Sequence, residues 1–78
     1  MFVYRCCAER RSSPDEGSYD CFGLMVQRLD CKHRPSPALA LVPDISVDRT
    51  FVEHLAELYT AYQLDPVHLL DAVEDALL

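Results

Sequence analysis

The spacing of apolar residues changes near residue 46, and this change constrains the fold more than any other feature. Before it, short runs of β-branched, aromatic and aliphatic residues alternate with turn-forming residues, as in strands. After it, apolar residues recur every three or four positions, as in helices that pack by one face. The sequence therefore predicts an α+β domain: a small antiparallel three-stranded sheet followed by two C-terminal helices (β-β-β-α-α).

Three segments of the first part have the composition of strands. We predict strands over residues 2–8, 19–29 and 38–42, the last of them ended by Pro43. Ser, Pro and Gly make residues 10–18 a loop between the first two strands. If that loop is centred near residue 14, the first two strands pair with Cys7 opposite Cys21.

Ser46 or Asp48 is expected to cap the first helix. Its apolar positions are Phe51, Leu55, Leu58 and Tyr62, with Val52 and Tyr59 beside them. Asp65-Pro66 starts the second helix, because a carboxylate at the N-cap and proline at the first helical position both suit a helix start. We expect the second helix to bury Leu69, Leu70, Val73 and Leu77.

The chain is long enough for one domain only, comprising residues 1–78, with a β-sheet part (1–45) and a helical hairpin (46–78). Half of its residues are hydrophobic, which is rich for so small a chain. A domain of this size barely offsets its conformational entropy by burial, so a second chain is a plausible source of further burial. We therefore expect a homodimer, with the exposed edge of the sheet as one route to it.

The net charge of −6 lies entirely in the helical part. Acids and bases balance over residues 1–45, whereas Arg49 is the sole base among the acids of residues 46–78. An acidic surface repels nucleic acid and anionic lipid and favours a basic partner. We therefore expect a protein partner, with a basic one favoured by this charge, and no binding to nucleic acid or membrane.

No stretch approaches the roughly 20 apolar residues of a membrane-spanning helix, and the first residues lack the pattern of a signal peptide. These features predict a cytoplasmic protein. Thiols are kept reduced there, and the spacing of the four cysteines fits no Cys-x-x-Cys site. We interpret Cys6, Cys7, Cys21 and Cys31 chiefly as buried thiols that act as small hydrophobes.

Three motifs stand out in the sequence: Phe22-Gly23-Leu24, Asp44-Ile45-Ser46-x-Asp48 and Leu64-x-Pro66-x-His68-Leu69-x-Asp71-x-Val73-Glu74-Asp75. They resemble motifs of a small bacterial (Firmicutes) family of unknown function. The resemblance is good over residues 42–77 and weaker before them, and the cysteines are not part of it. It implies a shared fold and a bacterial cytosolic setting, and it implies no activity.

The second helix carries the candidate site residues. His68, Asp71 and Asp75 follow one polar stripe, and an imidazole with two carboxylates is a weak candidate for a divalent metal site. A docking surface for basic residues, formed by Asp71, Glu74 and Asp75, is favoured over that metal site. A solvated helix face remains the simplest interpretation of the stripe.

Other groups of residues give weaker indications of a functional site. Cys31 and His33 would need two further ligands to hold zinc, and no cysteine stands in the signature of a known cysteine enzyme. Residues 66–78 contain three acids and no Lys or Arg, which excludes a DNA-reading helix. We expect no enzyme activity and no cofactor. The favoured hypothesis is a non-enzymatic protein-interaction or regulatory module, and the alternative is a small metal- or thiol-sensing regulator that uses His68/Asp71/Asp75 or the cysteines.

Overall fold

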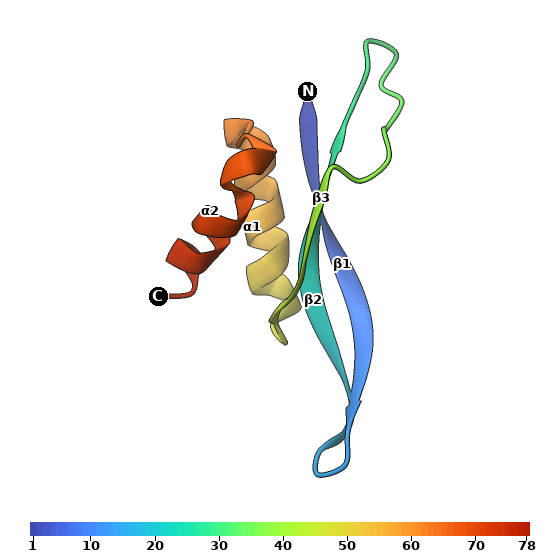
Figure 1. Ribbon diagram of the computed structural model, residues 1–78, viewed down its shortest axis with the longest axis vertical. Coiled ribbons are helices and arrows are strands. Elements are labelled where there is room, and N and C mark those ends of the chain that lie inside the picture. Colours follow the sequence, from blue (N-terminus) through green and yellow to red (C-terminus); the bar gives the residue numbers. More distant parts are fainter.

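The computed structural model describes residues 1–78 and contains one sheet and two helices. β1 (Phe2–Ser13), β2 (Gly17–Arg28) and β3 (Ala40–Ser46) form an antiparallel sheet in the order β1-β2-β3. α1 (Arg49–Tyr62) and α2 (Leu69–Ala76) follow and lie to one side of the sheet (Figure 1). The predicted α+β fold and its order of elements are confirmed.

β1 and β2 are longer than predicted. They continue through most of residues 10–18 and close in a tight turn, with Ser13 opposite Gly17. Gly17 has a φ of 75°, a conformation that costs glycine little. The hairpin extends past the helices (Figure 1), so polar residues there are solvated on both faces and resemble a loop in the sequence.

The predicted pairing of Cys7 with Cys21 is wrong. The turn is centred one residue later than assumed, which places Cys7 opposite Gly23 and Cys21 opposite Glu9. Cys7 and Cys21 still lie on the same face of the sheet, because both strands alternate with period two.

β3 starts later than predicted and continues past Pro43. Proline is tolerated because β3 is an edge strand whose other side need not donate to a ladder. The pairing jumps from Phe22↔Ser46 to Leu24↔Val42, so a bulge of β3 lies opposite Gly23. Asp44 takes a left-handed conformation (φ 55°) within this bulge.

The predicted helix starts are close to those observed. Asp48, rather than Ser46, caps α1, and its side chain accepts from the N–H of Phe51 at 3.3 Å. Asp65 accepts from the N–H of Val67 at 3.1 Å and begins a short 3₁₀ turn, η1 (Pro66–His68), that leads into α2.

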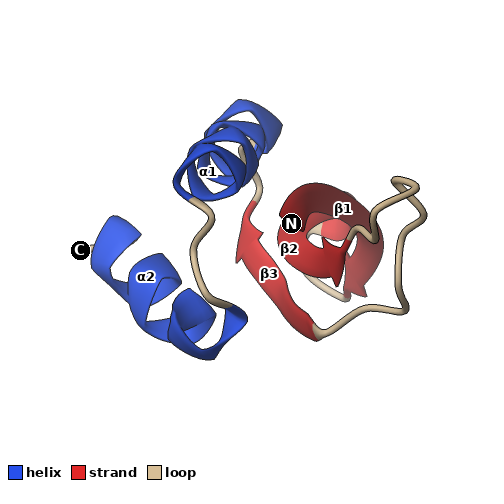
Figure 2. Ribbon diagram, turned by 90° about the horizontal axis from the view of Figure 1, so that it is seen from above, coloured by secondary structure: helices blue, strands red, loops and turns tan.

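The core lies between the helices and one face of the sheet. Its buried residues are Tyr4, Phe22, Leu24, Val26, Ile45, Val52, Leu55, Ala56, Tyr59, Leu69 and Val73. The helix faces were predicted only in part, because Leu58, Tyr62, Leu70 and Leu77 are exposed. α1 is rotated to bury Ala56 and Tyr59 instead, and no further layer covers the outer side of α2 (Figure 2).

Candidate functional site

α1 covers the outer edge of β1 at its N-terminal end. Gln63 accepts from the N–H of Phe2 and donates to the carbonyl of Phe2, both at 2.8 Å. The hydroxyl of Thr60 accepts from the N–H of Tyr4 at 2.9 Å. Thr60 of α1 and Gln63, the residue that caps the C-terminal end of α1, therefore satisfy backbone groups that would otherwise be free on this edge.

Beyond Tyr4 the same edge is open. β1 is the outermost strand, and its even-numbered residues direct their N–H and C=O groups away from β2, as Phe2 and Tyr4 show. By this alternation, Cys6, Ala8 and Arg10 present unpaired backbone groups, and the chain supplies them with no hydrogen-bond partner. Such a row is a template for a further strand.

An acidic cleft adjoins the open edge. It has a volume of about 370 Å³ and is lined by Tyr4, Arg5, Cys6, Glu53, Ala56 and Glu57. Glu53 accepts from Arg49 at 2.6 Å, whereas Glu57 forms no ion pair. Burial, and then the charge of Glu53, raises the pKa of the Cys6 thiol and keeps it protonated. The cleft therefore offers carboxylate charge to a basic side chain and no activated nucleophile.

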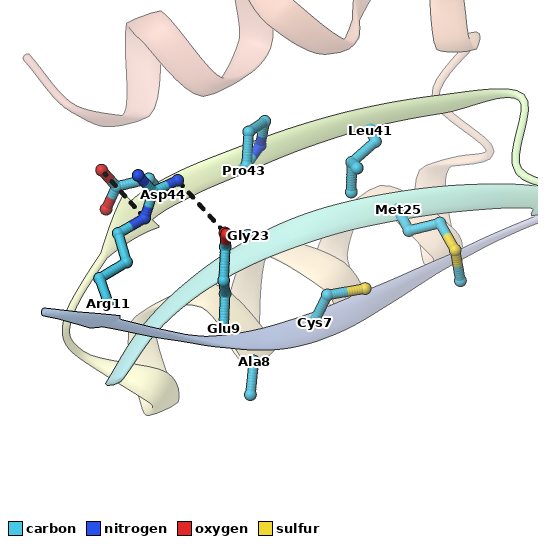
Figure 3. A pocket seen from close by; sticks show the side chains of 9 residues that line it. All are labelled: Cys7, Ala8, Glu9, Arg11, Gly23, Met25, Leu41, Pro43 and Asp44. Atoms are coloured by element: carbon cyan, nitrogen blue, oxygen red, sulfur yellow. Dashed lines mark hydrogen bonds and ion pairs between the residues drawn. The ribbon is translucent and has the colours of Figure 1, made fainter. Parts of the chain in front are cut away.

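A second hollow lies on the face of the sheet that the helices do not cover (Figure 3). It has a volume of about 510 Å³ and is lined by Cys7, Ala8, Glu9, Arg11, Gly23, Met25, Leu41, Pro43 and Asp44. Arg11 donates to Glu9 at 3.2 Å and lies 3.9 Å from Asp44. The neighbouring Cys21 side chain, and then the charge of Glu9, raises the pKa of Arg11. The hollow thus combines apolar side chains with charges that compensate one another, and it contains no histidine.

The residues singled out from the sequence, His68, Asp71, Glu74 and Asp75, are all exposed. His68 ends η1, and the three carboxylates belong to α2. Nowhere does the fold gather three His, Cys, Asp or Glu side chains in a way that could hold a metal ion. The stripe is therefore an acidic outer surface. It affects one core residue: the pKa of Tyr59 is raised first by the burial of Tyr59 and then by the charge of Asp75.

The four cysteines are free and differ in exposure. Cys21 is fully buried, Cys6 and Cys7 are half-buried, and Cys31 is exposed. The interpretation as buried thiols is therefore correct for Cys21 and wrong for Cys31, which lies in the loop before β3 together with exposed His33.

The sequence analysis did not identify four residues beside the β1 edge as functional: Glu53, Glu57, Thr60 and Gln63. Their polar side chains interrupt the apolar pattern of α1, which is also what a solvated helix face looks like. Only the position of α1 along β1 distinguishes these residues from ordinary surface residues.

No helix here has both the length and the apolar character needed to cross a membrane. No curated protein and no solved structure matches the chain. A family model described as "Family of unknown function (DUF6514)" matches residues 1–78. Since that match covers the whole chain, this protein belongs to the DUF6514 family of unknown function.

Proposed function

We propose that this chain is a non-enzymatic protein-interaction module that binds an extended protein segment along the open edge of β1. The observation that carries the proposal is the contrast along this edge. Side chains at the C-terminal end of α1 and at its C-cap satisfy the backbone of Phe2 and Tyr4, whereas Cys6, Ala8 and Arg10 are left without partners. Strand addition at such an edge gains affinity from main-chain hydrogen bonds and specificity from neighbouring side-chain pockets.

The acidic cleft supports a preference for a basic segment. A segment paired with Cys6 and Ala8 runs past Glu53 and Glu57, so a Lys or Arg at that point meets carboxylate charge. The acidic stripe of His68, Asp71, Glu74 and Asp75 adds long-range attraction for the same partner and repels nucleic acid and anionic lipid.

A bacterial cytoplasmic setting completes the proposal. It rests on the resemblance of the motifs at residues 44–48 and 64–75 to those of a Firmicutes family, and on the four free thiols, which suit a reducing compartment.

Selection from a displayed library of extended peptides, followed by binding to two variants, tests the proposal. Ala8→Pro removes an outward N–H but no hydrogen bond to β2, so edge strands tolerate it. Ala8→Val keeps the N–H and is the matched control. We expect basic peptides that bind the wild type and Ala8→Val and lose most binding to Ala8→Pro, with both variants folded by circular dichroism. Peptides that bind Ala8→Pro equally well would place the site elsewhere.

A further inference from the structure

We propose that the segment which pairs with the β1 edge is β1 of a second copy, in a register with Cys7 on the two-fold axis. This inference rests on the proposed function, since it uses the same open edge. It adds the identity of the partner and the alignment of the two strands.

Geometry restricts the registers that are possible. Two copies of one edge pair antiparallel about a two-fold axis, and outward-facing residues must meet outward-facing residues. Thr60 already occupies the N–H of Tyr4, so pairing cannot use that residue. An axis at Cys6 would leave only Cys6 free to pair, with its own copy, whereas an axis at one of residues 7 to 10 allows at least two free residues to pair.

Charge selects among these registers. An axis at Ala8 sets Arg5 opposite Arg11 of the second copy, and an axis at Glu9 sets that carboxylate against its own copy. An axis at Arg10 brings two guanidinium groups together. Like charges directly opposite each other destabilise a strand pair, so these three registers are disfavoured.

The axis at Cys7 sets Arg5 opposite Glu9 of the second copy, and the symmetry repeats this pair on the other side. Both residues are exposed on the helix-free face of β1, so neither must leave a buried site. Cys6 then pairs with Ala8 of the second copy through the unpaired backbone groups. Of the four registers, this is the one that sets no like charges opposite each other on either face.

The acidic cleft supports the same register. Pairing ends at Ala8 of the second copy, because Thr60 occupies the edge at Tyr4. Arg10 of the second copy follows two residues later, beside the cleft that Tyr4 lines with Glu53 and Glu57. Arg10 is well exposed, with 72% of its side chain accessible and only Asp20 as a partner at 3.3 Å. A guanidinium on a long, free side chain thus meets two carboxylates, of which Glu57 has no ion pair of its own.

Such a pairing joins the two sheets into one and places both helix layers on the same side. The contact is short, and interfaces below about 1,200 Å² are weak and transient. We therefore expect a reversible dimer that forms at high micromolar concentration.

Charge reversal tests the register. Arg5→Glu and Glu9→Arg each make both symmetric pairs repulsive, which is expected to weaken dimerisation roughly tenfold in sedimentation equilibrium. The double variant R5E/E9R restores opposite charges and is expected to dimerise within about threefold of the wild type. Lys32→Glu, at an exposed loop residue without an ion pair, is the control for net charge.

Cross-linking tests the position of the axis. Directly opposed residues in a non-hydrogen-bonded pair lie about 4.5 Å apart at Cα, which suits a disulfide. We expect diamide, which takes up the two thiol hydrogens, to link C6S/C31S through Cys7 and to leave C7S/C31S, which retains Cys6, unlinked. Cys21 stays in both variants because it is fully buried.

The outcomes separate this inference from the proposed function. A monomer at high micromolar concentration, with peptides still captured by the edge, overturns the second copy and leaves the interaction module standing. A dimer that R5E/E9R fails to restore, or that Cys6 links instead of Cys7, overturns the register. Dimerisation rescued by R5E/E9R and linked through Cys7 establishes both.

Discussion

Gly23 in β2 lies directly against the backbone of Val42 in β3. A Cβ built on Gly23 would collide with the carbonyl oxygen of Val42 and lie 2.8 Å from Cα of Pro43. The bulge of β3 therefore requires a glycine at position 23. Because the backbone of β3 can approach Gly23 so closely, Asp44 and Ile45 adopt their positions in and after the bulge. Two motifs that are separate in the sequence, Phe22-Gly23-Leu24 and Asp44-Ile45-Ser46, form one structural unit.

Gly23→Ala is expected to lower the free energy of unfolding by about 2 kcal/mol or more, because backbone atoms cannot move aside as a flexible side chain would. Urea unfolding measures this loss. Gly17→Ala is the comparison: its Cβ meets open space, so only the positive φ of 75° adds a cost of about 1 kcal/mol. Equal losses in the two variants would show that the close approach at Gly23 is unimportant.

Tyr4 connects the sheet to the segment that follows α1. Its contribution to the free energy of unfolding is expected to be lost at alkaline pH. Its hydroxyl donates to the carbonyl of Leu64 at 2.6 Å, and its ring meets Tyr59 edge-on at 5.7 Å between centroids. Burial, and then the charge of Asp65, raises the pKa of Tyr4 from 10.0 to about 12. The neutral Tyr4 phenol therefore contributes its full share of the free energy of unfolding below pH 10, and this contribution is lost as the pH rises through 12.

Tyr4→Phe is expected to cost about 1 kcal/mol at pH 7 through the lost hydrogen bond, and to make stability fall less steeply between pH 10 and 12. Tyr62→Phe is the control, since Tyr62 is 77% exposed. Chemical denaturation at several pH values measures both effects. An unchanged alkaline slope in Tyr4→Phe would mean that another group governs it.

Thr60 and Gln63 are expected to set where the β1 edge becomes open. Thr60→Val removes the acceptor for the N–H of Tyr4, and Thr60→Ser keeps it. Faster hydrogen exchange of the Tyr4 amide in Thr60→Val alone is the expected result, measured by NMR. Gln63→Gly keeps the left-handed helix end (φ 52°) without strain and should release the Phe2 amide. Amides that stay protected in both variants would contradict the capping role.

Thiol modification should proceed in order of exposure. Cys31 is expected to react first at neutral pH, and Cys31→Ser should abolish this fast phase. Cys6 should react more slowly than its exposure suggests, because burial and Glu53 raise its pKa, and its rate should rise only at a pH above that at which an ordinary cysteine thiol ionises. Cys21 should react only on unfolding. A fast reaction of Cys21 in the folded protein would contradict the structure around Arg11.

The order of elements could be predicted because apolar spacing and helix-start residues are local signals. Asp48 and the Asp65-Pro66 pair mark helix starts through their own backbone chemistry. The strand ends could not be predicted, since a hairpin solvated on both faces has the composition of a loop. Pro43 was taken as a strand end because its tolerance depends on β3 lying at the edge of the sheet.

The candidate site was largely hidden from the sequence. An exposed sheet edge could be expected from a three-stranded sheet, but not which part of it is free. That depends on the contacts of Thr60 and Gln63 with residues about sixty positions earlier. The buried side of each helix was also ambiguous, because Leu58 and Leu70 are as apolar as the residues that enter the core.

Amide hydrogen exchange along β1 tests the central claim most directly. At low concentration, the amides of Cys6, Ala8 and Arg10 should exchange fast while those of Cys7 and Glu9, which face β2, stay protected. When a partner strand binds, as a captured peptide or a second copy, the Cys6 and Ala8 amides should become protected. Protection of all these amides in the dilute protein, or none gained at Cys6 and Ala8 on binding, would contradict the account.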